Sequence, residues 1–352
     1  MLELLTSNLP PLKLTGFNTF IDAFYEQLDI HKEADIAVGY VSAESLAQLK
    51  RAVELYDVHK LNLTIGMHYI EKFTQLEYIA ACKLNEFLKS NKLGAVKVVL
   101  PFKYHGKMYL YKNSGTPISA IIGSNNLSGI IDSKRRVYEN SVLVNEKTML
   151  DSIGSFINSL YKKAAKDINE IEIKEFKRGN KLLDGLEGVS SINDTDIASA
   201  KADKTGISFN IPITPYERAP KSNINTCYGA GRTNKRTGIT IPRPWYEVEL
   251  IVPKTIYSNP NYPKGSSFAV VTDDGYSFNC MAQGSIGVEK NFRSENDLEI
   301  LGKWIKGKLV NAGVLNIGER VTKKVLDDYG RDYMTLKKLK NGKWFLDFEV
   351  TK

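Results

Sequence analysis

The chain has 352 residues, of which 42% are hydrophobic and 25% are charged. That length favours two domains, or three, each with an ordinary hydrophobic core. No run approaches the roughly 18 apolar residues of a membrane span, and the N-terminus has no features of a signal peptide. The three cysteines are too widely spaced to indicate a zinc site or a disulfide framework, so we expect a soluble protein of a reducing cytoplasm.

The net charge of +8 is unevenly distributed along the chain. Residues 1–200 contain 24 Lys and Arg against 24 Asp and Glu, whereas residues 201–352 contain 24 against 16. No acid lies between Glu217 and Glu247, a stretch that holds six cations. Such a stretch is suited to a polyanion such as DNA, and a solvated basic loop without a ligand is the alternative.

Strand and helix patterns alternate through the first 165 residues, which is typical of an α/β domain. Apolar segments predict strands at 34–41, 61–66 and 95–100, with helices at 43–58 and 73–90 between them. Further strands are predicted at 103–111, 118–122 and 138–144, followed by a helix at 147–163. We therefore expect a mixed sheet flanked by helices.

The periodicity and composition of the sequence change after residue 165. Residues 166–205 show weak periodicity and predict a linker with one short helix. Beyond residue 206, short apolar segments separated by turns rich in Pro, Gly and Asn predict a mainly-β domain with two helices, at 296–312 and 318–329. The expected organisation is a domain over residues 1–165, a linker over 166–205 and a second domain over 206–352.

A short polar motif carries the chemistry of the first domain. The sequence His105-Gly106-Lys107 is followed, after one apolar strand, by Gly123-Ser124-Asn125-Asn126. Residues two apart on a strand point to the same face, so we expect His105 and Lys107 to address one phosphate side by side. The turn after the next strand brings the Ser124 hydroxyl and the Asn126 carboxamide to the same place. A structural histidine is the alternative interpretation.

These residues resemble the HxK and GSxN half-motif of the phospholipase D superfamily. The resemblance implies that His105 attacks phosphorus and forms a covalent phosphohistidine. It implies that Lys107 and Asn126 hold the non-bridging oxygens, that Ser124 supports them, and that no metal or other cofactor is needed. A nucleophile of this kind divides one difficult displacement into two easier ones, and fixed donors stabilise the charge on the oxygens.

The chain departs from this superfamily at Lys112, where an aspartate usually stands. We expect Glu139, at the start of the strand 138–144, to supply the missing carboxylate, as in the BfiI-like restriction endonucleases that this arrangement resembles. An exposed acid at a strand edge is the alternative for Glu139. Only one HxK motif occurs, whereas lipid-hydrolysing members carry two. A single copy implies a homodimer through the N-terminal domain.

Residues 241–250 (IPRPWYEVEL) resemble the recognition half of NgoFVII- and NgoAVII-type restriction enzymes, which combine a phospholipase D-like nuclease with a B3-like β-barrel and read short GC-rich sites. The resemblance implies two arms that grip the major groove of double-stranded DNA, one within 218–236 and one around 272–283. Cations suit guanine or phosphate, and carboxylates suit cytosine. The expected DNA-binding residues are Arg218, Lys221, Asn225, Arg232, Lys235, Arg236, Asp273, Asp274, Tyr276, Asn279 and Gln283.

The sequence thus predicts a type II-like, metal-independent restriction endonuclease of the bacterial cytoplasm that cuts at or near a GC-rich site. A cognate methyltransferase and an ATPase or helicase-like subunit are its expected further partners. One alternative is a DNA-binding subunit whose nuclease site is degenerate or needs a partner ATPase, as the missing aspartate suggests. The other is a phospholipase or small-phosphodiester hydrolase, which the single motif disfavours. Cleavage of plasmid DNA in EDTA distinguishes the first hypothesis from both alternatives.

Overall fold

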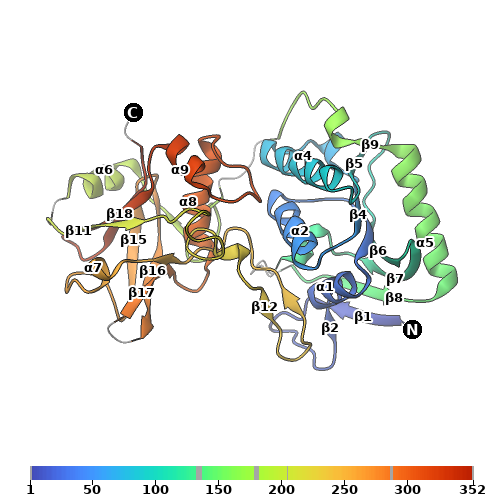
Figure 1. Ribbon diagram of the computed structural model, residues 1–352, viewed down its shortest axis with the longest axis horizontal. Coiled ribbons are helices and arrows are strands. Elements are labelled where there is room, and N and C mark those ends of the chain that lie inside the picture. The colour runs from blue at the N-terminus through green and yellow to red at the C-terminus, as the bar shows by residue number, and fades with distance from the viewer. Residues whose placement is uncertain (1, 132–136, 178–181, 204, 286–287, 351–352) are drawn as a thin grey trace. The chain divides into compact units, whose positions relative to one another are not determined.

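The computed structural model describes residues 2–131, 137–177, 182–203, 205–285 and 288–350. The chain forms two compact units (Figure 1). The first unit comprises Met1–Gly179 and Gly231–Pro242, and the second comprises Asn180–Ala230 and Arg243–Lys352. Among the described residues, no helix has the length and apolar character needed to cross a membrane.

A nine-stranded mixed sheet forms the centre of the first unit, in the order β2-β1-β8-β7-β6-β3-β4-β5-β9. Strands β3, β4 and β5 are parallel, whereas β6, β7 and β8 pair antiparallel. This confirms the expected mixed sheet. The strands are β1 (Leu2–Thr6), β2 (Asn18–Thr19), β3 (Glu33–Val38), β4 (Lys60–Ile65), β5 (Val96–Val99), β6 (Lys107–Asn113), β7 (Thr116–Gly123), β8 (Asn140–Val144) and β9 (Ala165–Asp167).

The helices predicted at 43–58, 73–90 and 147–163 are present with shifted ends, and two further helices, Phe20–His31 and His68–Glu71, were not predicted. The segment predicted as one helix at 73–90 begins only after Thr74, whose side chain accepts from Glu77 N and caps the helix. The helix over Phe20–His31 was not predicted, because its buried face includes Asp22 as well as apolar residues. The helices are α1 (Phe20–His31), α2 (Ala43–Leu55), α3 (His68–Glu71), α4 (Gln75–Ser90) and α5 (Lys147–Ser159), with short turns η1 (Leu127–Ile130), η2 (Leu160–Ala164) and η3 (Ile168–Glu170).

An eight-stranded sheet forms the centre of the second unit, in the order β11-β18-β19-β15-β16-β17-β14, with β10 paired to β16. The strands are β10 (Ser190–Ser191), β11 (Ser208–Pro212), β14 (Leu250–Ile251), β15 (Ser267–Thr272), β16 (Tyr276–Ser285), β17 (Val288–Ser294), β18 (Tyr333–Lys338) and β19 (Trp344–Asp347). The helical elements are α6 (Asp194–Ala202), α7 (Lys254–Tyr257), α8 (Glu299–Asn311), α9 (Lys323–Tyr329) and η4 (Thr226–Tyr228). The mainly-β architecture with two helices after residue 295 matches the prediction, although the second helix begins at Lys323 and not at residue 318.

Two segments pack differently from the local sequence pattern. Within the segment expected as a linker, β9 pairs with β5 in the first unit, whereas α6 buries Ala200 against Val271 and Phe345 in the second. The hairpin of β12 (Arg232–Thr233) and β13 (Thr240–Ile241) belongs to the first unit, although the chain on both sides of it belongs to the second. Tertiary partners far away in the chain place both segments.

Helix α8 forms the core of the second unit, because Leu301, Trp304 and Ile305 are buried along it. Gly302 allows the helix to approach the main chain of Tyr246, since a Cβ atom at this position would overlap the Tyr246 carbonyl oxygen. Backbone cannot rotate away as a side-chain end can, so this position requires glycine.

We predict that Gly302→Ala lowers the free energy of unfolding of the second unit by about 1–3 kcal/mol or more, because the added methyl group overlaps main-chain atoms. Gly307→Ala on the same helix is the control, since its Cβ meets the side-chain end of Leu182 at 2.9 Å. The measurement is denaturant unfolding followed by tryptophan fluorescence, because all three tryptophans lie in the second unit. Equal stability of the two variants would contradict the close packing.

Candidate functional site

His105 and Lys107 meet at the start of β6. The strand begins at Lys107 and not at residue 103, because Tyr104 N donates to Gly66 O instead of pairing with β3. The side chains still come together: Lys107 Nζ lies 3.0 Å from His105 Nε2 and donates to His105 O at 2.7 Å. An ammonium group only donates, so in this contact Nε2 is the nitrogen with the lone pair. Burial lowers the pKa of Lys107, while the charge of Glu139 acts in the opposite direction.

Asn126 is held next to the histidine by the loop that follows β3. Tyr40 N donates to Asn126 Oδ1 at 3.0 Å, so the amide nitrogen of this side chain is the group that can donate to a substrate oxygen. The Tyr40 ring lies edge-on to the His105 ring, with 5.6 Å between the centroids. A Cβ atom on Gly39 would lie 3.1 Å from His105 Cδ2, so the loop backbone approaches the histidine closely.

Ser124 and Glu139 lie at the junction of β7 and β8. Ser124 Oγ donates to Asn140 O at 3.2 Å and accepts from Asn140 N at 3.1 Å, which fixes the residue next to Glu139. Glu139 and Asn126 line one hollow of about 240 Å³, together with Phe20 at the start of α1. The structure therefore brings the predicted catalytic residues to one edge of the sheet.

Lys112, which replaces the usual aspartate, has a structural partner. Its Nζ lies 2.6 Å from Asp35 Oδ2 on the neighbouring strand β3, at the opposite end of β6 from Lys107. Any carboxylate that assists the histidine must therefore come from another segment. Glu139 is such a residue, and its charge opposes the effect of burial on the pKa of Lys107.

Three residues that support the site were not predicted. Asn125 is buried, with its Oδ1 accepting from Ser141 Oγ at 2.7 Å and its main-chain oxygen accepting from Tyr109 OH at 2.9 Å. Tyr40 contacts both His105 and Asn126, as described above. The sequence did contain one signal for Tyr40. It follows Gly39, directly after a buried strand, and binding sites commonly form where such strands end.

His68 is the third of these supporting residues. Its side chain is buried, and its Nε2 accepts from Val41 N at 3.0 Å. The ring is stacked on Phe73 with 4.6 Å between centroids and lies edge-on to Tyr40 at 5.6 Å. His68 thus anchors the loop that holds Asn126, and burial lowers its pKa, against the opposing charge of Glu77.

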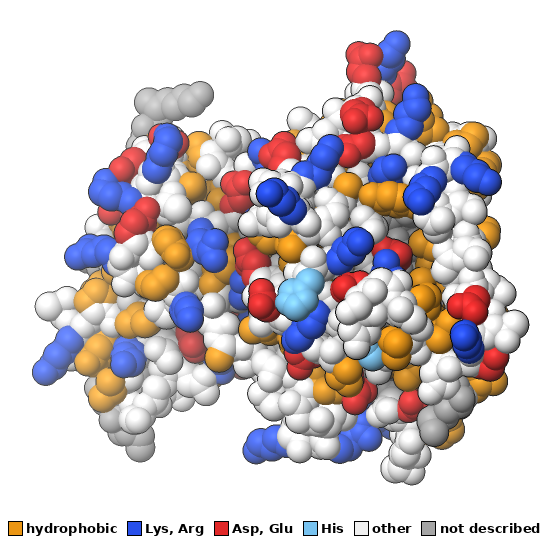
Figure 2. All heavy atoms as spheres, turned by 45° about the vertical axis from the view of Figure 1, so that its right-hand side comes forward, with side chains coloured by type: hydrophobic (Ala, Val, Ile, Leu, Met, Phe, Trp, Pro, Cys, Tyr) orange, Lys and Arg blue, Asp and Glu red, His pale blue; other side chains and the backbone are white. Residues whose placement is uncertain are grey.

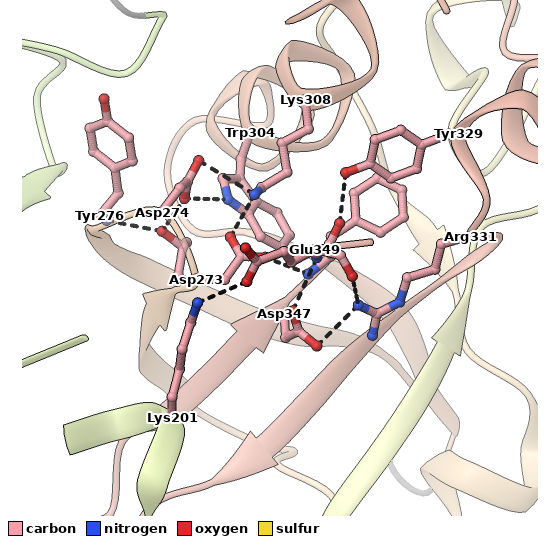
Figure 3. A network of polar contacts seen from close by, with 12 residues as sticks. Lys201, Asp273, Asp274, Tyr276, Trp304, Lys308, Tyr329, Arg331, Asp347 and Glu349 are labelled. Carbon is pink, nitrogen blue, oxygen red and sulfur yellow. Dashed lines mark hydrogen bonds and ion pairs between the residues drawn. The ribbon is translucent and has the colours of Figure 1, made fainter. Parts of the chain in front are cut away.

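Several residues expected in the second DNA-binding arm belong to an internal polar network (Figure 3). Asp273 is buried, lies 2.6 Å from Lys308 Nζ and accepts from Phe348 N at 2.7 Å. Asp274 accepts from Trp304 Nε1 at 2.9 Å. Both carboxylates connect the β15–β16 turn to α8, and Asp273 also connects it to the chain after β19. Asp274 is itself exposed, whereas breaking the buried contacts of Asp273 would be costly.

Two further members of the expected set have internal partners. The Tyr276 hydroxyl donates to Asp184 Oδ1 at 2.9 Å. Asn225 is fully buried, and its carboxamide donates to Val321 O and accepts from Val321 N, both at 3.0 Å. This geometry corrects the expectation that these side chains present free base-reading groups, and we do not include them or the two aspartates among the proposed DNA contacts.

The remaining expected DNA-binding residues are exposed. On the face shown in Figure 2, Lys and Arg side chains are intermixed with Asp and Glu side chains and do not form one continuous patch. The exposed DNA-binding residues are Arg218, Lys221, Asn279 and Gln283 in the second unit and Arg232, Lys235 and Arg236 in the first.

The described residues contain no group of three His, Cys, Asp or Glu side chains suited to a metal ion.

Two protein families match this chain. Residues 18–173 match the NgoFVII restriction endonuclease N-terminal PLD domain, and residues 199–340 match the NgoFVII C-terminal B3-like DNA-binding domain. These matches confirm the expected phospholipase D-like and B3-like fold classes. No curated protein matches the chain.

The solved structures that resemble part of the chain include a phospholipase D family member. This protein, Nuc from Salmonella typhimurium, has 12% identity and a TM-score of 0.32, and the match covers 47% of this chain and 97% of that one. NucT from Helicobacter pylori has 11% identity and a TM-score of 0.30, with 47% and 97% covered. Phosphatidylserine synthase from Haemophilus influenzae Rd KW20 has 16% identity and a TM-score of 0.36, with 49% and 41% covered.

We predict that the His68 site makes the protein less stable as the pH falls from 7 to 5. Burial keeps the pKa of His68 below its unfolded value, so the unfolded state binds more protons below about pH 6.5 and stability decreases there. His68→Gln keeps an acceptor for Val41 N and should flatten this pH dependence. His68→Leu leaves that N–H group unsatisfied and should cost about 1–3 kcal/mol at pH 7.

The measurement is urea unfolding of the wild type and both variants at pH 7 and pH 5. The difference between wild type and His68→Gln isolates the contribution of this histidine from other titrating groups. An unchanged pH dependence in His68→Gln would contradict the assignment of a neutral, buried imidazole.

Proposed function

The chain belongs to the NgoFVII family of restriction endonucleases, and from this premise we propose that it cuts double-stranded DNA through a covalent phosphohistidine on His105. It is a DNA-hydrolysing enzyme with a phospholipase D-like nuclease domain and a B3-like DNA-binding domain. The observation that carries the mechanism is the 3.0 Å contact between Lys107 Nζ and His105 Nε2.

In the proposed mechanism, Lys107 transfers its hydrogen bond from Nε2 to a phosphate oxygen. His105 Nε2 then attacks phosphorus while the bond to the leaving oxygen breaks and that oxygen takes up a proton, which the hydrolytic water replaces in the second step. Lys107 and the Asn126 amide nitrogen donate to the non-bridging oxygens, where they stabilise the developing charge. Water hydrolyses the phosphohistidine in the second step and restores the imidazole. Ser124 positions the start of β8, directly after Glu139, and Glu139 supplies the carboxylate that the motif itself lacks.

Metal independence is part of the same proposal. Lys107 supplies positive charge and Asn126 supplies a neutral donor at the phosphate, and these are the functions that a Lewis-acidic ion otherwise serves. The family resemblance further supports a short GC-rich recognition site, read by exposed residues of the second unit. On the same basis we propose a cognate methyltransferase and an ATPase or helicase-like subunit as partners.

We also propose that the active enzyme is a homodimer through its N-terminal domain. The chain has four histidines, and only His105 is followed by lysine two residues later. Two copies are therefore needed to reproduce the paired motifs of the two-motif relatives. For the domain boundaries we propose a nuclease domain over residues 1–165 and a DNA-binding domain over residues 206–352, joined by the segment 166–205. The hairpin Gly231–Pro242 is the exception, because it belongs to the first unit.

We predict that His105→Ala reduces cleavage by at least about 10³-fold, because it removes the nucleophile, while binding to cognate DNA stays within a few-fold. His59→Ala is the matched control, since His59 is exposed and is not followed by lysine. Plasmid digestion and gel-shift titration give the two quantities. Loss of binding together with cleavage would contradict the separation of reading from cutting.

We predict that excess EDTA leaves the initial cleavage rate within about two-fold of the rate in Mg²⁺, because protein side chains supply the charge and donors at the phosphate. Digestion of a plasmid in the two buffers at equal ionic strength provides the comparison. If activity disappears in EDTA and returns when Mg²⁺ is added, the proposed metal-independent step is wrong.

A further inference from the structure

The hairpin Gly231–Pro242, here called the basic hairpin, is an ordered part of the first unit. Strands β12 and β13 pair antiparallel, and the Thr233 and Thr240 hydroxyls lie 2.9 Å apart across them. At the turn, Asn234 N donates to Ile239 O at 2.8 Å, and Asn234 Oδ1 accepts from Arg236 N at 2.9 Å. The turn therefore has a defined shape that positions the side chains it carries.

Buried side chains of α2 and the segment after it attach the basic hairpin to the nuclease unit. Gln48 is buried and donates from Nε2 to Pro242 O at 2.8 Å. Tyr56 is also buried, and its hydroxyl donates to Thr240 O. Both bonds end on main-chain oxygens, so the hairpin is held through its backbone and does not depend on its cationic side chains.

A third attachment places the hairpin next to the hollow that Asn126 and Glu139 line. Asn234 Nδ2 donates to Asp22 Oδ1 at 3.1 Å, in the first turn of α1. The two residues before Asp22, Phe20 and Ile21, line this hollow as well. The hairpin is thus anchored one residue from the wall of a hollow that contains two of the predicted catalytic residues, whereas His105 and Lys107 lie outside its lining.

The hairpin carries three exposed cations, Arg232, Lys235 and Arg236, and contains no acid. The Arg236 guanidinium lies 4.0 Å from Oδ2 of the buried Asp22. A pair at that distance with an exposed guanidinium holds the arginine weakly. A rigid surface with this charge is suited to the DNA backbone.

We propose that the basic hairpin binds the phosphates that flank the cut site and so positions DNA in the nuclease unit. It therefore contributes to cleavage and general affinity and does not select bases. This inference rests on the proposed function, and it deepens that function by assigning a DNA-backbone contact to the nuclease unit. It also reassigns three residues that the sequence alone placed in a base-reading arm.

The test combines Arg232→Gln, Lys235→Gln and Arg236→Gln in one variant. In a His105→Ala background, the slope of log affinity against log salt on a non-specific duplex should fall by about two to three, roughly 0.9 for each phosphate that the hairpin no longer neutralises. In the active enzyme, kcat/KM for cleavage should fall at least ten-fold, while the ratio of cognate to singly mismatched cleavage stays unchanged.

Two controls separate position from charge. Lys162→Gln, Lys163→Gln and Lys166→Gln together remove three exposed cations in and before β9, the strand at one edge of the nine-stranded sheet, and should leave both readouts unchanged. Arg232→Lys with Arg236→Lys keeps the charge and should retain cleavage, because lysine binds phosphate but lacks the planar fork that reads guanine.

Three results would overturn the inference. The first is that the triple Gln variant has the salt slope and the cleavage rate of the wild type. The second is that this variant shows a relaxed base preference, and the third is that the Arg-to-Lys variant no longer selects its site. A wild-type enzyme that cuts no DNA would refute the proposed function instead. Even then, the salt dependence in the His105→Ala background would still decide whether the hairpin binds the backbone.

Discussion

The contact between the Lys107 ammonium group and His105 Nε2 is the constraint around which the nuclease site is built. Lysine can only donate, so His105 Nε2 carries the lone pair and directs it at the Lys107 ammonium group. The lone pair becomes free to attack when that ammonium group donates to a phosphate oxygen instead. A phosphate that enters this site meets a nucleophile and a cation together. The surrounding loops then need only to hold these two groups still and to add a second donor.

The supporting loops achieve this mainly through backbone hydrogen bonds. Tyr40 N fixes the Asn126 carboxamide, and His68 in turn fixes the next residue of the same loop through Val41 N. The Ser124 hydroxyl connects the end of β7 to the start of β8 by hydrogen bonds to the main-chain oxygen and the main-chain nitrogen of Asn140. Main-chain partners change position little with side-chain rotamers, so the donor geometry is set before the substrate binds.

Recognition and cutting draw on different kinds of surface in this chain. The polar network around Asp273 and Lys308 is directed inward and stabilises the second unit, whereas the cations of the basic hairpin are directed outward from the first. Phosphate contacts give affinity without sequence information, and base contacts give specificity. A nuclease unit that itself binds the DNA phosphates can keep the cut site positioned at His105 while the second unit reads the sequence.

Local sequence determined the α/β and mainly-β parts, because apolar periodicity persists into the folded chain. It also predicted that His105 and Lys107 lie side by side, as they do, and proposed them with Asn126 as the site. Only the tertiary structure showed that Asn225 is buried against Val321 and that the basic hairpin belongs to the nuclease unit. The physical reason is that the charge or polarity of a residue can be read from sequence, but its partner cannot. That partner lies scores of residues away and is set by how each unit packs.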